Sequence, residues 1–423
     1  MLNKIQFKKV KGIFTMTTTI TKLWNKNFFL FVTGMELSLI GNALLRFVLP
    51  LYILLETGDP ALMGTVTALA SIPLIAFLPI GGLAADRLNK RVLFAVMNFA
   101  TAIAIIVYFG ISNVMDIVPA TIIFMLFFSA FESMITPSTE ASVPALVPAD
   151  DLVKANSVTW LLSIFSTVGS PILGGFILAR FGLIPILFVS IALYLLATIV
   201  KLMVQIPYTK QKMDESLLKT IVKDLKDAIY FVTKENTEIG KLMLTSIFVG
   251  FFLLPVTYVA LPVLASTYLG MGETIVGVMQ GSVMFGGTLG VILIGVLGEK
   301  ANITKARLFL LICSTALLLS GLGFMLSSNV KVTSIILIVS FFTVMIFFTI
   351  FAIIASAYMG EKIPEHLIGK VMSLDVTIIW LATAAGNYIF GLLFSHFINS
   401  PGIALLIIGG FATAGALCVR IRG

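Results

Sequence analysis

The feature that most constrains this chain is a succession of twelve apolar runs, each about 20 residues long, separated by short polar segments. A helical run of this length matches the ~30 Å hydrocarbon core of a bilayer. Within lipid, a helix is the structure that satisfies all backbone hydrogen bonds inside one segment. Of the 423 residues, 59% are hydrophobic and 11% are charged, and a typical soluble domain carries about 25% charged residues. The sequence therefore predicts an all-α membrane protein.

The limits of the apolar runs predict the spans and the domains. The first six predicted spans are 28–55, 62–83, 92–112, 116–138, 156–179 and 182–204. The second six are 241–268, 274–297, 306–327, 332–358, 367–397 and 402–420. The corresponding domains are a basic tail at 1–27, a six-helix bundle at 28–204, a linker at 205–240 and a second six-helix bundle at 241–420.

Most of the 28 Lys and Arg residues fall on one side of these spans. On the other side lie Arg180 and Lys331, and Arg46 lies within the first span. By the positive-inside rule, the basic side is cytosolic, so both termini are predicted to be cytosolic in a multi-pass plasma-membrane protein. The long run after residue 27 is not a signal peptide. Translation starts at either Met1 or Met16.

The linker and an internal sequence repeat indicate how the two halves are connected and arranged. Between 218 and 232, apolar residues recur at helical spacing and most bases lie on the other face. This predicts an amphipathic helix on the cytosolic membrane surface, or else a solvated linker helix. The segment Pro148–Asn156 resembles Pro364–Ser373, and the turn after the second span resembles the turn after the eighth. The two pairs are separated by a similar number of residues, which indicates parallel six-helix repeats with a midplane site between them.

One cytosolic turn carries a motif of Gly82, Asp86, Arg87, Lys90 and Arg91. Asp86 can accept hydrogen bonds at the N-terminus of a neighbouring helix, where the helix dipole favours an anion. The spacing resembles the loop 2–3 signature of the major facilitator superfamily, Gly-x-Leu-Ala-Asp-Arg-x-Gly-Arg-Lys. The resemblance implies a cytosolic gate, in which this turn packs against the end of the eleventh span.

A second motif in the fifth span comprises Gly169, Pro171, Gly174 and Gly175. Proline removes a backbone donor and bends the helix, and the paired glycines permit close packing against a partner helix. The motif resembles the Gly-Pro-x-x-Gly-Gly signature of drug/proton antiporters, with Ser170 in place of the glycine before the proline. A plain kinked helix is the alternative interpretation.

Two further stretches, Leu39–Pro50 and Pro137–Pro148, resemble the macrolide-efflux and siderophore-export type of twelve-helix exporter in the same superfamily. The resemblance covers essentially the whole chain. It implies two pseudo-symmetric six-helix bundles that export small amphipathic molecules by alternating access, in exchange for protons. The chain departs from the pattern at Asn42, where relatives often carry an acid, and in the fourth span, which lacks the basic residue of many drug/proton antiporters.

Three acidic residues inside spans, Glu36, Glu132 and Asp375, are the candidate proton carriers. Charged groups in hydrocarbon are costly, so their default interpretation is functional. The first and fourth spans line the cavity in the superfamily, so the resemblance implies that Glu36 and Glu132 can be neighbours. The alternative for each acid is a structural hydrogen bond to Ser, Thr or Tyr.

Arg46, Asn42 and Asn387 are the candidate polar residues of the cavity. Arg46 is alternatively a structural partner for a helix-end carbonyl or for an acid on another helix. Three intramembrane acids against one base predict a neutral or cationic amphiphile as substrate.

The predicted function is secondary active transport, with export by proton antiport as the first hypothesis. Import of a nutrient, or flipping of a lipid or lysolipid, is the alternative on the same fold. No paired Ser, His and Asp, metal-ligand spacing or phosphate loop occurs, so an enzyme, a metal site and a cofactor are not expected. The predicted partners are a small molecule, protons and the bilayer, without nucleic acid, and the protein is predicted to be a monomer.

Overall fold

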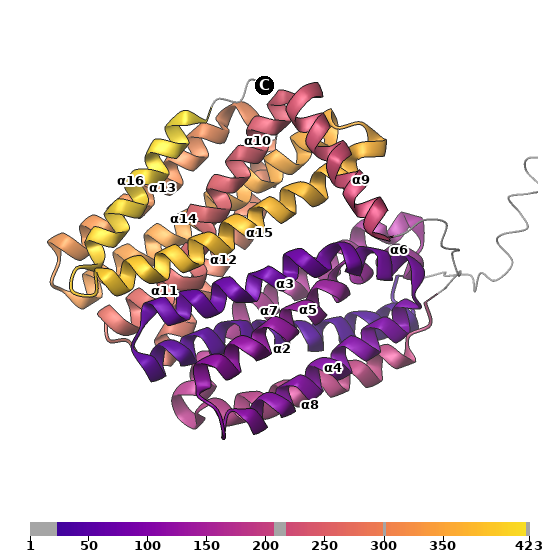
Figure 1. The fold of residues 1–423 in the computed structure, drawn as a ribbon, viewed down its shortest axis with the longest axis horizontal. Coiled ribbons are helices and arrows are strands. Elements are labelled where there is room, and N and C mark those ends of the chain that lie inside the picture. Colours follow the sequence, from indigo (N-terminus) through magenta and orange to yellow (C-terminus); the bar gives the residue numbers. More distant parts are fainter. Residues whose placement is uncertain (1–22, 207–216, 299–301, 420–423) are drawn as a thin grey trace, which may run out of the picture.

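The computed structural model describes residues 23–206, 217–298 and 302–419, without the side chains of 79, 83, 85–87 and 217–222. The Asp86 and Arg87 side chains of the loop motif therefore lie outside the described residues. Within these limits, twelve helical segments are long and apolar enough to cross a membrane. The predicted number and order of spans are confirmed, and Figure 1 shows them as a bundle of long, roughly aligned helices.

The first half contains six long helices and one short helix. They are α2 (Lys26–Thr57), α3 (Pro60–Arg87), α4 (Lys90–Ile111), α5 (Ile117–Glu140), α6 (Val143–Leu146), α7 (Leu152–Phe181) and α8 (Leu183–Met203). We call the end of the bundle where α2 begins the proximal end, and the end where α2 stops the distal end. Successive long helices alternate in direction between these two ends.

The second half follows the linker helix α9 (Leu217–Tyr230). Its helices are α10 (Thr237–Phe248), α11 (Leu261–Val263), α12 (Glu273–Leu297), α13 (Ala306–Leu326), α14 (Val330–Lys362), α15 (Glu365–His396) and α16 (Pro401–Cys418). Short 3-10 turns lie at Ala149–Asp151 and Ile303–Lys305, and π turns at Phe231–Glu235, Val249–Leu253, Val256–Ala260 and Leu264–Tyr268.

Local sequence explains the first distal reversal, between α2 and α3. Gly58 ends α2 in the left-handed region, with φ of 66°, and its N–H donates to the Leu54 carbonyl. Asp59 then caps α3 by accepting from the Ala61 N–H at 2.9 Å, and Pro60 occupies the first helical turn, where its missing N–H costs nothing. These residues turn the chain back within a few positions.

The helices pack as two groups that meet along two seams. In the first half, α2 packs on α7 and α8, α3 on α5, and α4 on α8. In the second half, α14 packs on α12 and α13, and α13 also packs on α16. Between the halves, α3 runs along α15, and α7 runs along α12; the first of these seams crosses the middle of Figure 1. The domain boundaries at 28–204 and 241–420 stay predictions.

The seventh span differs from the regular helix predicted for 241–268. From Thr237 to Tyr268, α10 and α11 alternate with π turns, and two prolines, Pro255 and Pro262, lie among them. Proline has no N–H and clashes with the preceding turn, so the regular hydrogen-bond ladder is interrupted there. Isolated π turns inside helices often occur at functional sites, and this span contributes to the cavity described below.

The linker helix α9 docks on the proximal part of α15. Lys370 Nζ lies 2.9 Å from Asp224 Oδ1 and 2.6 Å from Asp227 Oδ2. Ala228 and the following Phe231 are buried in the same core cluster as the second half. The linker is thus a helix packed on α15, and its position on the cytosolic membrane surface stays a prediction.

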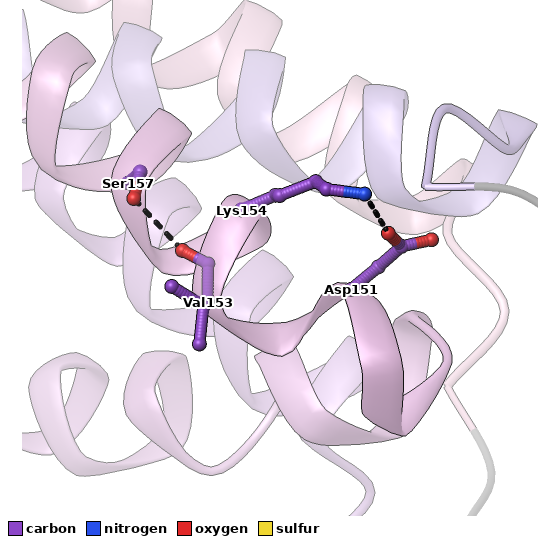
Figure 2. Close-up of polar contacts among 4 residues, drawn as sticks. All are labelled: Asp151, Val153, Lys154 and Ser157. Atoms are coloured by element: carbon purple, nitrogen blue, oxygen red, sulfur yellow. Dashed lines mark hydrogen bonds and ion pairs between the residues drawn. The ribbon is translucent and has the colours of Figure 1, made fainter.

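The equivalent segment of the first half makes local contacts instead. At the proximal start of α7, Lys154 Nζ lies 2.8 Å from Asp151 Oδ1, and Ser157 Oγ donates to the Val153 carbonyl at 2.8 Å (Figure 2). The repeated segment therefore starts a long helix in both halves, but its lysine binds different partners in each.

Candidate functional site: a central cavity between the halves

A cavity of about 190 Å³ lies between the two halves. Four of its polar lining residues come from three different spans, so neither half forms it alone. The first half contributes Asn42 and Arg46 from α2, and the second half contributes Tyr258 from the seventh span and Gln280 from α12. The remaining wall is mainly apolar or hydroxyl-bearing and includes Phe47, Met63, Pro171 and Met284.

Arg46 is the charged residue of this lining. Its Nε donates to Asn42 Oδ1 at 3.1 Å, one helical turn earlier on α2, and its guanidinium reaches Ser129 Oγ on α5 at 3.5 Å. The guanidinium carbon also lies 5.4 Å from the centre of the Phe128 ring. These contacts fix the group at the wall while leaving it in contact with the cavity, where its remaining donors can meet a ligand.

Glu132 lies behind this wall rather than in it. Its Oε1 accepts from the Tyr194 hydroxyl at 3.1 Å, and Asn42 also hydrogen-bonds its carboxylate. The positive charges of Arg46 and Lys201 both act on Glu132. Glu132 is therefore coupled to the cavity through Asn42 and Arg46.

Lys201, near the proximal end of α8, is the second base of this cluster. It is only 2% exposed, its Nζ donates to Ser38 Oγ at 3.1 Å, and it lies 5.0 Å from the centre of the Phe94 ring. Lys201 lies inside the predicted sixth span, 182–204, near its cytosolic end, and the structure shows that its side chain is buried there against α2. The buried charge balance is thus less acidic than the sequence indicates.

Glu36 and Asp375 occupy separate surroundings. Glu36 Oε1 accepts from the Ser166 hydroxyl on α7, and its Oε2 is buried with no partner in the described part of the chain. Asp375 is 5% exposed and hydrogen-bonds Ser246 on α10. Neither acid belongs to the cavity lining. Glu36 and Glu132 have different hydrogen-bond partners, Ser166 on α7 and Tyr194 on α8.

Glycines bring the two seams into backbone contact near the distal end. A Cβ on Gly175 would lie 2.4 Å from the Glu273 carbonyl oxygen, and one on Gly277 would lie 2.3 Å from the Pro171 carbonyl oxygen. On the other seam, a Cβ on Gly64 would lie 2.6 Å from the Asn387 carbonyl oxygen. Side chains are excluded at these positions, so the halves are closed against each other there.

The fifth-span motif supplies part of this contact. Gly174 faces α2, where an added Cβ would meet Val48 at 2.8 Å, whereas Gly175 faces α12. Gly169, one to two turns earlier, has open space around it. Pro171 reaches the cavity wall, and the candidate Asn387 lies at the α3–α15 seam, 1% exposed, with its Oδ1 unpartnered among the described residues.

The loop motif lies at the proximal end. Lys90 Nζ donates to the Ala141 carbonyl at 2.8 Å, which joins the start of α4 to the end of α5. The Arg91 N–H donates to the Asn89 side chain at the cap of α4, and Gly82 has open space around it. These contacts organise the turn within the first half.

Comparison with known proteins identifies the family. The family model described as Major Facilitator Superfamily matches residues 31–387. The chain belongs to the Major Facilitator Superfamily. Within the superfamily, it is 22% identical over 371 residues to macrolide efflux protein A of Streptococcus pyogenes, covering 86% of this chain and 88% of that protein.

The chain is also similar to a second macrolide efflux protein and, in fold, to solved transporter structures. Macrolide efflux protein A of Enterococcus faecalis is 22% identical over 334 residues, covering 77% of this chain and 99% of the relative. The crystal structure of a D-xylose–proton symporter superposes with a TM-score of 0.72 at 18% identity, over 94% of this chain and 98% of that one. The structural likeness shows the twelve-helix fold, which the sequence resemblance implied.

Sequence reasoning missed two residues of the site, Gln280 and Lys201. Gln280 is 4% exposed and its Oε1 has no partner among the described residues. Its signal was a lone amide inside an otherwise apolar run. For Lys201, the signal was the apolar residues on both sides of it, from Ile199 to Val204, which extend the span beyond the charge.

Proposed function

We propose that this protein exports small amphipathic molecules by alternating access, in exchange for protons. The observation that carries the proposal is a cavity shared by the two halves, lined by Arg46 and backed by Glu132, on which the charges of Arg46 and the buried Lys201 both act. Superfamily folds of this kind place substrate sites between repeats. Export, rather than import, is favoured by the relatives named for macrolide efflux.

The wall chemistry favours a neutral substrate over a cationic one. Arg46 contributes a positive charge to the lining, and the three candidate acids lie outside it. Gln280 offers an acceptor, and Arg46 offers donors. We therefore propose an oxygen-rich amphiphile that accepts hydrogen bonds from Arg46 and donates one to Gln280.

We assign the proximal end to the cytosol and both termini with it, in the plasma membrane. The basic residues of the turns support this orientation. The distal glycine contacts then correspond to a closed outer side. Because the cavity and both seams are formed within one chain, we propose that a monomer is sufficient.

For proton coupling we propose Glu132 as the first candidate and Glu36 as the second. Glu132 connects to the cavity through Asn42 and Arg46, so its protonation would change the charge that Arg46 presents to substrate. Glu36 has a free buried oxygen beside α7. Asp375 remains a third candidate, within the second half.

The test is accumulation of radiolabelled tacrolimus, an uncharged macrolide, in cells with and without the protein, repeated with a protonophore. We expect lower accumulation in cells that contain the protein, and loss of that difference when the proton gradient is dissipated. Glu132→Gln and Glu36→Gln are compared in the same assay. Efflux by the variant that lacks the proton-carrying acid should no longer depend on the proton gradient. Equal accumulation with and without the protein would refute macrolide export.

The loop motif is proposed as the cytosolic gate of this cycle. Asp86→Asn should abolish efflux while leaving the amount of protein in the membrane unchanged. Wild-type efflux by that variant would exclude a gate that depends on the Asp86 charge.

A further inference from the structure

A second cavity of about 660 Å³ lies between α7, α12 and α14. Its lining includes Trp160 and Ile164 on α7, Val291 on α12 and Phe348 on α14. No charged residue belongs to this lining; its polar groups are hydroxyls. The cavity, which we call the cleft, is therefore suited to an apolar group and carries no anchor for an ion.

The cleft and the central cavity share two wall residues, Thr167 and Met284. Just distal to this point, α7 and α12 touch, because a Cβ on Gly281 would lie 2.6 Å from the Val168 carbonyl oxygen. Proximal to it, the two helices separate around the cleft. The two spaces are thus neighbouring chambers along one seam.

The volumes of the two chambers indicate that one ligand occupies both. Pockets that bury a drug-sized molecule have volumes of about 300–1,000 Å³. The central cavity, at about 190 Å³, is below this range, whereas the cleft, at about 660 Å³, is within it. A ligand whose polar part reaches Arg46 needs further space for the rest of its volume, and the cleft is adjacent.

We propose that the cavity and the cleft form one two-chamber site for an amphiphile. Its polar head binds between Arg46 and the unpartnered Gln280 Oε1 in the central cavity, and its apolar part occupies the cleft beyond Met284. This inference rests on the proposed transport of amphiphiles and defines their class: an uncharged head with hydroxyl or carbonyl oxygens, joined to a flexible apolar group.

The cleft contains its own reporter, Trp160. The full chain, with Trp24→Phe and Trp380→Phe, is reconstituted in lipid nanodiscs and titrated with hexyl, octyl and decyl maltoside below their micelle concentrations. These probes keep one hydroxyl-rich head and vary the chain. We expect a saturable change in Trp160 emission, with affinity rising roughly fourfold for each added methylene that is buried.

Two glycines on α12 provide a matched pair of variants. Gly287 lines the cleft, where an added Cβ would lie 3.2 Å from Thr349 Oγ1, whereas Gly295 has open space around it. Gly287→Val should weaken the binding of decyl maltoside at least roughly tenfold and change the affinity for hexyl maltoside by no more than about twofold. The reason is that the lost contacts are to the methylenes farthest from the head group. Gly295→Val should behave as the wild type.

Two further variants test the contribution of each chamber separately. Ala352→Phe fills the cleft from α14 and should reproduce the Gly287→Val result if the latter folds poorly. Gln280→Leu removes the acceptor in the central cavity and should weaken all three maltosides by a similar factor. Thermal unfolding of each variant in the same nanodiscs checks that the protein is intact.

An unchanged decyl maltoside affinity in both cleft-filling variants would overturn the two-chamber site. Absence of a saturable Trp160 response in the wild type would also overturn it. Neither result depends on transport. Conversely, a failure of tacrolimus export with an intact Trp160 response would refute the proposed function and leave the two-chamber site standing.

Discussion

Lys154 and Lys370 occupy equivalent positions in the two repeats, yet they bind carboxylates in different parts of the chain. Each follows the proline of its repeated segment by six positions. Lys154 lies 2.8 Å from Asp151 in its own turn, whereas Lys370 lies 2.6 Å from Asp227 on the linker helix. In the second half, the lysine of the repeated segment thus attaches α9 to α15.

Replacing Lys370 with alanine should loosen α9. The change removes the ion pairs to Asp224 and Asp227 while the buried Phe231 still holds the end of the helix. We expect backbone hydrogen exchange of residues 223–230 to accelerate by roughly two- to fivefold, the scale of partly exposed ion pairs. Lys154→Ala is the matched control and should leave exchange in α9 unchanged; equal acceleration in both variants would contradict the attachment.

The same contact predicts a pH dependence. The hydrogen bond from Lys370 is the main cause that holds the pKa of Asp227 below its ordinary value of 3.8. A carboxylate with a lowered folded-state pKa stabilises the docked helix above its ordinary pKa, and this contribution is lost as the pH falls through the folded-state pKa. Exchange protection of α9, corrected for the intrinsic rate, should be constant from neutral pH to about pH 5 and fall below about pH 4. Asp227→Asn should weaken this acid transition; a transition centred near neutral pH would show that another group controls docking.

Gly175→Ala should separate the halves at the distal end. The new methyl group would lie 2.4 Å from the Glu273 carbonyl, so α7 and α12 must move apart. Alanine is a better helix former than glycine by about 1 kcal/mol, so weaker helix formation cannot cause the effect. Spin labels near the distal ends of α7 and α12 should report a longer distance, and efflux should fall at least roughly tenfold if closure of this seam is part of the cycle.

Gly169→Ala is the control for that change, on the same helix and in the same motif. Its surroundings are open, so the variant should retain the wild-type distance and efflux. A wild-type distance distribution in Gly175→Ala would show that the seam tolerates a side chain.

Glu132→Gln should destabilise the first half through Lys201 and Arg46. Lys201 and Arg46 then lose their electrostatic attraction to the Glu132 carboxylate. Lys201 is 2% exposed, and leaving a buried polar group without its compensating partner costs about 1–3 kcal/mol. We expect a decrease of that order in the free energy of unfolding, measured by denaturation in mixed detergent micelles.

A double-mutant cycle with Lys201→Met tests the coupling. Methionine keeps the length of the side chain without the charge, so Glu132→Gln with Lys201→Met should be less destabilised than Glu132→Gln alone. Additive losses from the two single variants would indicate that Glu132 and Lys201 do not interact energetically.

Much of the fold follows from residues that act locally. The first predicted span, 28–55, becomes Lys26–Thr57, because Asn25 caps its start and Gly58 ends it. A cap and a left-handed glycine belong to one stretch of sequence, so their effect can be predicted from that stretch. The long apolar runs add the membrane requirement, and together these signals predict the number and order of the spans.

The site could be predicted only in part, because its contacts join distant segments. Arg46 and Asn42 were identified as polar groups within an apolar run, and they do line the cavity. Lys201 was counted among the cytosolic bases, but Gly34 leaves room for it to pack against α2: a Cβ at Gly34 would lie 2.8 Å from Lys201 Cγ. A glycine on one helix that accommodates a lysine on another produces no local pattern, so burial of that charge required the packed structure.

The backbone contacts of Gly175 with α12 and of Gly64 with α15 concentrate the steric demand of the interface at one end. In the wall of the cleft, Gly287 is less restricted, because an added Cβ there would lie 3.2 Å from the Thr349 hydroxyl oxygen. During evolution, these backbone contacts can stay unchanged while the walls of the two chambers vary, so related proteins could bind different molecules without a change in how the two halves pack.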